Sequence, residues 1–217
     1  MIADIPLWPI LAKLAEGLLA TLALSLIAFA LGGVAGLAVL FARVGRSPLA
    51  RRIARTYIQA FQNTPLLMQM FLVFFGASMA GFDVSPWTAA AVGLTLYTSA
   101  YLAEVWRGCV EAVPRGQWEA SASLAMGYVQ QMRHVVLPQA LRLSIAPTVG
   151  FSVQIVKGTA VASIIGFNEL TKLGSMLANA TFQPFLIYAL VAAGYFLLCW
   201  PLSLCASHLE KKLHASR

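Results

Sequence analysis

The stretch GLLATLALSLIAFALGGVAGLAVLFA, residues 17–42, contains no charged side chain and consists mainly of Leu, Ala and Gly. The hydrocarbon core of a bilayer is about 30 Å thick, and a helix needs about 20 apolar residues to cross it. The stretch is long enough, so we expect a transmembrane helix here. Four further runs have a similar character, and we predict spans at 57–80, 87–107, 143–167 and 185–206. The expected fold class is an all-α integral membrane protein with five transmembrane helices.

The overall composition agrees with a membrane protein. Of the 217 residues, 59% are hydrophobic and 11% are charged, whereas a soluble domain has about 45–50% and about 25%. A soluble enzyme is therefore excluded. The chain is also basic, with 15 Lys and Arg against 8 Asp and Glu. Such an excess indicates either a nucleic-acid-binding patch or cations sorted to one side of a membrane.

The positions of the cations favour the membrane interpretation. Most of them lie in segments 43–56, 107–142 and 207–217, the last of which includes Arg217. Five crossings place these three segments on one side, which the positive-inside rule makes cytoplasmic. We therefore expect the N-terminus outside, the C-terminus inside and no nucleic-acid partner. The N-terminus contains Asp4 and no early cation, so it does not resemble a cleaved signal peptide.

No catalytic, cofactor or metal site is expected on this chain. It has no phosphate-binding loop of the Gly-x-x-x-x-Gly-Lys-Ser/Thr type and no set of nucleophile, base and orienting acid. Its histidines have no metal-ligand spacing, and its three cysteines form neither a zinc motif nor an even disulfide framework. If ATP drives a process here, its hydrolysis takes place on another chain.

The segment 108–142 is too polar to cross a bilayer, and we expect helices that lie outside it. It contains an acidic residue, small residues, a bend and a Leu-Pro pair, formed by Glu119, Ala120, Ser121, Ala125, Gly127, Leu137 and Pro138. This pattern resembles the EAA loop of permease subunits of ATP-binding-cassette importers. Ala125 stands where that loop usually has glycine, and we expect Gly127, two residues later, to supply the bend.

Further pieces resemble the polar amino acid branch of these permeases. They are NTPLL at 63–67, AYLAEVWRG at 100–108, RGQ at 115–117, LPQALR at 137–142, KGT at 157–159 and EL at 169–170. Their order is preserved over nearly the whole chain. The resemblance implies a MetI-like transmembrane domain over residues 14–209, with coupling helices between the third and fourth spans.

The resemblance also implies an assembly in a bacterial cytoplasmic membrane. Its other members would be a second permease subunit, identical or not, two ATP-binding subunits that carry ATP and Mg²⁺, and an extracytoplasmic solute-binding protein. The implied cargo is a polar amino acid. An opine, an osmolyte or another small polar solute is the alternative in the same class, and a membrane-embedded enzyme or assembly scaffold is the alternative in another.

The chemistry of the EAA pattern suits a docking element. Ala120 and Ser121 are small enough for a helix to enter a groove on a partner, and Glu119 offers a charge-assisted contact. Pro138 lacks an N–H donor, so we expect a break between the loop and the fourth span there. The alternative is an amphipathic helix that lies on the lipid surface.

Polar residues inside the predicted spans are candidates for a substrate path. Lys157 interrupts the fourth span, where a cation costs about 2.5–3.5 kcal/mol, so it faces a wet cavity, pairs with Glu104 or reaches the interface. The backbone from Lys157 to Thr159 is a candidate gate. Glu104 and Arg107 are helix neighbours and favour a structural pair over a substrate clamp. Pro65 predicts a kink at which Asn63 and Thr64 lie beside the path.

Overall fold

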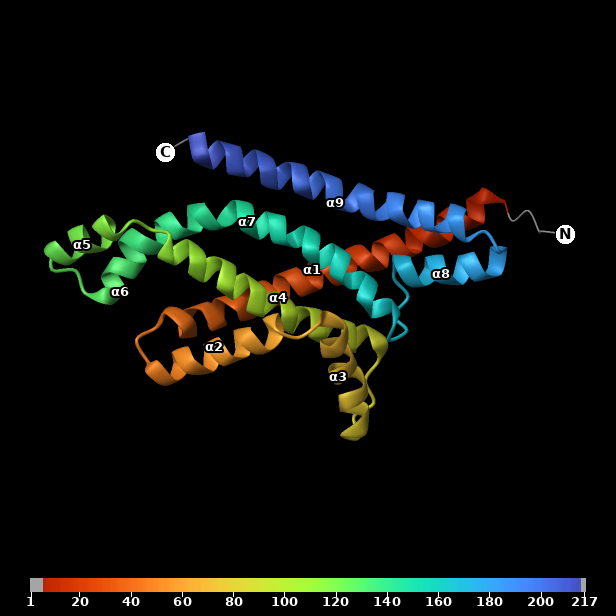
Figure 1. Ribbon diagram of the computed structural model, residues 1–217, viewed down its shortest axis with the longest axis horizontal. Helices are drawn as coiled ribbons and strands as arrows, with labels where there is room; N and C mark the ends of the chain where they lie inside the picture. The colour runs from red at the N-terminus through yellow and green to blue at the C-terminus, as the bar shows by residue number, and fades with distance from the viewer. Residues whose placement is uncertain (1–5, 216–217) are drawn as a thin grey trace.

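The computed structural model describes residues 6–215, which form helices joined by short connections and contain no strand (Figure 1). The predicted all-α class is confirmed. Asp4 and Arg217 lie outside the described residues. In chain order the elements are α1 (Leu7–Val44), α2 (Pro48–Gln62), α3 (Leu66–Met79), α4 (Pro86–Glu111), α5 (Arg115–Ser123), α6 (Tyr128–Gln131), the π-helical turn η1 (Met132–Val136), α7 (Leu137–Gly158), the 3₁₀ turn η2 (Thr159–Ser163), α8 (Leu170–Thr181) and α9 (Pro184–Ala215).

Three helical stretches of the described chain are long and apolar enough to cross a membrane by length and composition. They are Leu7–Val44, Tyr128–Ser163 and Pro184–Lys212. Helix α3 is apolar but shorter. Helix α4 has 26 residues, but it carries several Thr and Ser side chains and a charged C-terminal turn. These criteria therefore identify three of the five predicted spans.

The close packing of α1 on α4 forms the centre of the bundle. A Cβ atom added at Gly32 would lie 2.6 Å from Cβ of Thr98, and one added at Gly36 would lie 3.1 Å from the carbonyl oxygen of Ser99. The two glycines therefore let the helix backbones approach where a larger residue would clash, as is common between membrane helices. Leu24 and Leu94, both fully buried, belong to the apolar core beside this contact.

The predicted span 57–80 is wrong as a single helix. Helix α2 ends at Gln62 and α3 begins at Leu66, and α3 leaves the body of the molecule at a steep angle to α2 (Figure 1). Pro65 precedes α3 with an extended ψ of 139°. Because proline has no N–H and disfavours helical geometry in the residue before it, the kink expected at Pro65 is a complete break.

Other predicted boundaries also differ from the structure. Helix α1 begins ten residues before residue 17, at Leu7, and includes the exposed ion pair between Lys13 and Glu16. The fourth span does not start at residue 143, because the chain is helical from Tyr128 through η1, α7 and η2 to Ser163. Helix α8 was not predicted. Its sequence is only partly apolar, and its N-terminus is defined by a side-chain cap from Glu169 that hydropathy does not detect.

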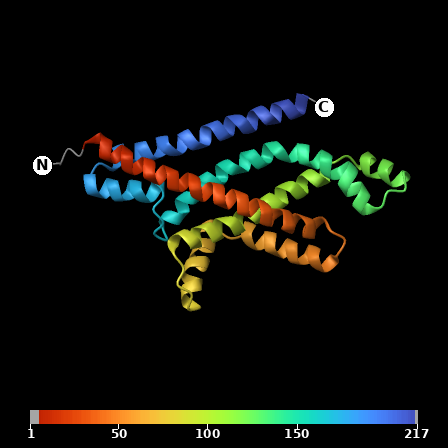
Figure 2. The ribbon, with the colours of Figure 1, turned by 180° about the vertical axis from the view of Figure 1, so that it is seen from behind.

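The two ends of the elongated molecule differ in content. The connection between α1 and α2, helices α5 and α6 and the C-terminus all lie toward one end, whereas the N-terminus and α8 lie toward the other (Figures 1 and 2). The three cation-rich segments of the sequence thus gather at the same end. Lys13 in α1 and Lys172 in α8 belong to the opposite end.

Candidate functional site

The EAA segment, defined here as residues 119–138, begins on helix α5. Pro114 precedes this helix, as expected for a helix start. Glu119 and Ala120 are exposed, but Ser121 is buried and its hydroxyl donates a hydrogen bond to the carbonyl oxygen of Trp118 at 2.9 Å. Glu119 and Ala120 thus belong to the exposed surface of α5, while Ser121 packs inward.

The bend after α5 is at Ala125 and not at Gly127 as we expected. Ala125 has a φ of +55°, whereas Gly127 is extended, with φ −68° and ψ 160°, and precedes α6. The amide of Met126 donates to the carbonyl of Ser121 at 3.2 Å, and the amide of Ala125 donates to that of Ala122 at 2.9 Å. This pair of bonds is a Schellman motif, whose left-handed residue is usually glycine. The substitution of alanine there places a strained residue in the segment.

The expected break at Pro138 is also wrong, because the helix continues through it. Pro138 is the second residue of α7, and the preceding turn, Met132–Val136, widens to π-helical geometry. The amide of Leu137 bonds to the carbonyl of Met132, five residues earlier. Proline removes one i→i−4 bond, and a wider turn accommodates that loss without interrupting the helix.

The EAA segment is joined firmly to the rest of the bundle. Met132 and Val136 pack in one apolar cluster with Val110 and Val113 at the end of α4. The hydroxyl of Tyr128 donates to the carbonyl oxygen of Val44 at the end of α1, at 2.5 Å. The segment therefore contacts α1 and α4 and continues directly into α7.

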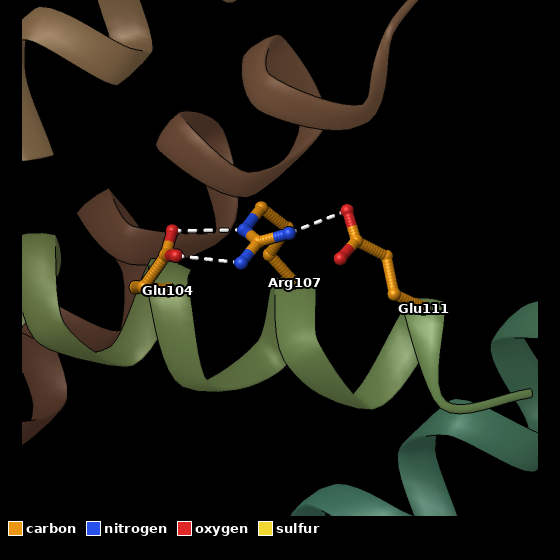
Figure 3. Close-up of polar contacts among 3 residues, drawn as sticks. All are labelled: Glu104, Arg107 and Glu111. Carbon is orange, nitrogen blue, oxygen red and sulfur yellow. Dashed lines mark hydrogen bonds and ion pairs between the residues drawn. The ribbon is translucent and has the colours of Figure 1, made fainter.

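Glu104 and Arg107 form the expected pair on one side of α4 (Figure 3). Arg107 Nε donates to Glu104 Oε2 at 2.9 Å and Arg107 Nη2 to Oε1 at 2.7 Å, while Nη1 pairs with Glu111. The guanidinium is thus bound on both sides, which agrees with a structural role. Glu104 also lines a polar cavity of about 210 Å³ between α1, α2 and α4, with Arg43, Arg55, Ile58, Gln59 and Gln62.

Lys157 does not pair with Glu104. In residues 6–215 the salt bridges involve Lys13 and Arg107 with their glutamates, and Lys157 has none. Its side chain is exposed and lines a cavity between α7 and α9 that also contains Tyr195 and Cys199. The ion-pair alternative is therefore wrong, and Lys157 faces an open surface.

Two helix irregularities meet in the middle of the molecule. At the first, between α2 and α3, the Thr64 hydroxyl donates to the carbonyl of Ala60, and Gln69 Nε2 donates to the carbonyls of Phe61 and Thr64. At the second, α7 tightens to 3₁₀ geometry at Thr159, which is fully buried and donates to the carbonyl of Val156.

Gly158 brings these two irregularities together. A Cβ atom on Gly158 would lie 3.2 Å from Cδ2 of Leu66, the first residue of α3. The contact joins the start of α3 to the end of α7, while Asn63 and Thr64 are exposed and Thr159 is buried. Lys157 projects on the α9 side of α7, and Glu104 lies in the polar cavity farther along α4, so the five predicted path residues do not form a single cluster.

One buried polar network was missed by the sequence analysis. The Glu169 carboxylate is fully buried and accepts hydrogen bonds from the hydroxyl of Tyr195 at 2.6 Å and the amides of Thr171 and Lys172 at 2.9 and 2.7 Å. Burial raises the pKa of the Glu169 carboxyl, against the lowering effect of these bonds. The network fastens α8 and α9 to the chain that follows η2. An acidic residue directly before a helical pattern is the cap signal that would have identified it.

The described residues contain no group of three or more His, Cys, Asp or Glu side chains that could hold a metal ion. What the fold and the site define is a helical membrane subunit with a protruding polar segment at one end and broken helices at its centre. The chain belongs to the family of binding-protein-dependent transport system inner membrane components, whose family model matches residues 28–215.

Individual relatives agree with this family. The chain is 32% identical to the probable amino-acid ABC transporter permease YckA of Bacillus subtilis, covering 91% of this chain and 87% of that protein. It is 32% identical to the glutamine transport system permease GlnP of Escherichia coli K12, covering 95% of each. A crystal structure of an amino acid ABC transporter with histidines matches with a TM-score of 0.89 at 31% identity, over 93% of this chain and 94% of that one. The resemblance to the polar amino acid branch of ATP-binding-cassette permeases is confirmed.

Proposed function

We propose that this chain is a permease subunit that carries a polar amino acid across the bacterial cytoplasmic membrane, driven by ATP hydrolysis on separate subunits. The observation that carries the proposal is the EAA segment. Its exposed face on α5, with Glu119 and Ala120, is attached through α6 and η1 to three long helices. Named amino-acid permeases related over nearly the whole chain support the substrate class.

The proposed topology has five crossings, formed by α1, the broken pair α2–α3, α4, the continuous helix from α6 to η2, and α9. At about 1.5 Å per residue, the 26 residues of α4 extend about 39 Å, which exceeds the hydrocarbon thickness of about 30 Å. The cation-rich end, with α5 and α6, is cytoplasmic, and the N-terminus and α8 lie outside. The gathering of the cation-rich segments at one end supports this orientation.

In the proposed mechanism, each of two ATP-binding subunits receives the exposed face of α5 in a groove. Glu119 supplies a charge-assisted contact there, and the small side chain of Ala120 permits close approach. When the ATP-binding subunits close, the EAA segment moves and carries the ends of α1, α4 and α7 with it. ATP and Mg²⁺ are bound entirely by those subunits, so this chain contributes positioning and not catalysis.

The proposed pathway runs between two permease subunits and past the region where Gly158 meets Leu66. Discontinuous helices are the elements from which transporters build substrate sites and gates, because their free backbone groups line a polar cavity. Thr159 directly follows Gly158, and Asn63 and Thr64 lie in the connection before Leu66, so these three residues are the candidates for the path. Alternating access follows if the two irregularities separate on one side while the extracytoplasmic solute-binding protein delivers substrate from the other.

A test of the docking role uses charge reversal with a matched control. We expect Glu119→Lys to lower uptake by the reconstituted complex by about tenfold or more, since a reversed interfacial charge costs several kcal/mol. Glu210→Lys makes the same charge change on an exposed residue of α9 outside the segment and should leave uptake near the parental level. If tagged protein brings down no ATP-binding subunit and Glu119→Lys transports normally, the proposal fails.

The cargo is tested separately. Ligand-stimulated ATPase activity of the complex with its solute-binding protein, measured across a panel of amino acids, opines and osmolytes, should rise most with a polar amino acid. A larger response to an opine or osmolyte would favour the alternative substrates. A membrane-embedded enzyme or scaffold would show no stimulation by any of them.

A further inference from the structure

An apolar groove lies on the cytoplasmic half of the bundle, next to the EAA segment but away from its exposed face on α5. It has a volume of about 700 Å³ and is bounded by α1, α4 and α7. Its apolar lining includes Leu37 and Phe41 from α1 and Leu141 and Ile145 from α7. The volume lies within the range of about 300–1,000 Å³ typical of small-molecule sites.

Away from Arg133, the hydrogen-bonding side chains that line the groove already have partners. The indole nitrogen of Trp106 donates to the hydroxyl of Thr148 at 2.8 Å, and the hydroxyl of Ser144 donates to the carbonyl of Leu141 at 2.8 Å. These polar atoms are thus already paired. Since a polar solute would lose its hydration without compensation, the groove suits an apolar chain.

The groove opens on an exposed apolar surface of the bundle. Leu37 and Phe41 are 44% and 53% exposed, and they continue a stripe of exposed leucines on α1 that includes Leu19, Leu22 and Leu26. Residues 17–42 carry no charge. On the opposite wall, Leu141 is 67% exposed. An apolar chain can therefore enter sideways from the bilayer.

The length of the groove fits one leaflet. Its α7 wall extends from Leu137 to Val149, about 18 Å at 1.5 Å per residue. Half of the hydrocarbon core is about 15 Å thick. At the cytoplasmic end of this wall lies Arg133, which is exposed and, within residues 6–215, has no carboxylate within salt-bridge distance. An unpaired guanidinium at headgroup depth is a phosphate ligand.

We propose that this groove binds an anionic phospholipid of the cytoplasmic leaflet, with one acyl chain between α1 and α7 and its phosphate on Arg133. The inference rests on the proposed membrane orientation but not on the identity of the transported solute. Because Arg133 belongs to η1, the bound headgroup contacts the element that connects the EAA segment to α7. The bound lipid would thus contact the connection between the EAA segment and α7.

The alternative occupant is the second permease subunit. The groove is less suited to it, because the apolar helix α3 already projects from the body as a separate surface for a partner (Figure 2), whereas the groove has a cation at one end. A second copy would bring an apolar helix to the groove, whereas the exposed Arg133 at its end favours a ligand that carries a phosphate. The anionic lipid satisfies both features.

The test measures lipid retained by the purified complex in native mass spectrometry, after equilibration with equal amounts of phosphatidylglycerol and phosphatidylcholine. The parental complex should retain phosphatidylglycerol preferentially. Arg133→Gln should weaken that retention by about tenfold, the effect of losing one charge-assisted bond. Ser144→Phe, which fills the groove, should reduce retention of both lipids.

Arg142→Gln is the matched control, because it removes a cation from an exposed position of α7 that does not line the groove, and it should retain phosphatidylglycerol as the parent does. Co-purification of the ATP-binding subunits with each variant distinguishes lost lipid from lost assembly. Equal retention by the parent, Arg133→Gln and Ser144→Phe would overturn the proposal. So would an efficient disulfide cross-link between subunits of a Leu141→Cys variant, since the partner would then cover the groove.

Discussion

Residues 17–42 and residues 57–80 are both uncharged and apolar, yet the first lies within one 38-residue helix and the second is divided between two. The second segment carries several amide side chains and is less apolar, and it also contains Pro65, which cannot donate a backbone hydrogen bond. Mean hydropathy over a sequence window reports how favourably the side chains enter lipid. It does not detect one missing backbone N–H donor.

The two segments are also stabilised by different contacts. In α1, glycines bring the backbone against α4, and every interior residue keeps its place in one helix. In the divided segment, the freed carbonyls of Phe61 and Thr64 are satisfied by the side-chain amide of Gln69, which is itself buried. A membrane break is stable only with such compensation. The glycines thus allow α1 to pack closely on α4, and the Gln69 amide stabilises the break between α2 and α3.

The largest expected effect comes from disrupting the glycine contact between α1 and α4. Gly32→Leu should lower the stability of the complex by about 3 kcal/mol, because the new side chain begins 2.6 Å from Thr98 and α1 must move away from α4. The measurement is the midpoint of thermal unfolding in detergent. The neighbouring glycine, Gly33, is the control, since a Cβ there meets no atom closer than 4.0 Å. Equal destabilisation by Gly33→Leu would mean that α1 is not held at Gly32.

The second prediction concerns the hydrogen bonds that Gln69 makes at the break between α2 and α3. Gln69→Leu leaves the carbonyls of Phe61 and Thr64 without the amide donor and should lower stability by about 2 kcal/mol. The same substitution at Gln154, which is exposed and makes no side-chain hydrogen bond within residues 6–215, should change stability little. Unfolding midpoints of the two variants give the comparison. Coincident midpoints would show that solvent or another group satisfies the break.

The extent to which the fold was predictable follows the same division. Long apolar helices such as α1 and α9 were found because their signal is summed over many residues. Helix α8 was not, because it is short and depends on the Glu169 cap, which is one side chain. The continuity of the helix through Pro138 was missed for a related reason. A π-helical turn before a proline depends on how the backbone relaxes, and no residue type is specific to it.

The candidate site was predicted in position but not in detail. The EAA pattern located an exposed helix and a turn at one end of the molecule, and Glu104 and Arg107 form the expected pair. The orientation of Ser121 was not predictable from spacing, because the register of a short helix against its neighbours decides which small residue is buried. Lys157 faces α9 and not α4, and that choice depends on the rotation of α7 in the bundle.

The smallest expected effect concerns a single backbone position in a turn, Ala125, which is compared with the single position Pro65 in the divided segment. Ala125 holds a left-handed φ of +55° in the Schellman motif that ends α5. Ala125→Gly should therefore stabilise the turn by about 1 kcal/mol, because glycine adopts this geometry without the Cβ clash. Thermal unfolding and hydrogen exchange of residues 121–127 measure the gain. Ala122→Gly, on the exposed face of α5, should instead destabilise it by about 0.5–1 kcal/mol. Slower exchange in Ala122→Gly than in Ala125→Gly would reverse the assignment of the strained residue.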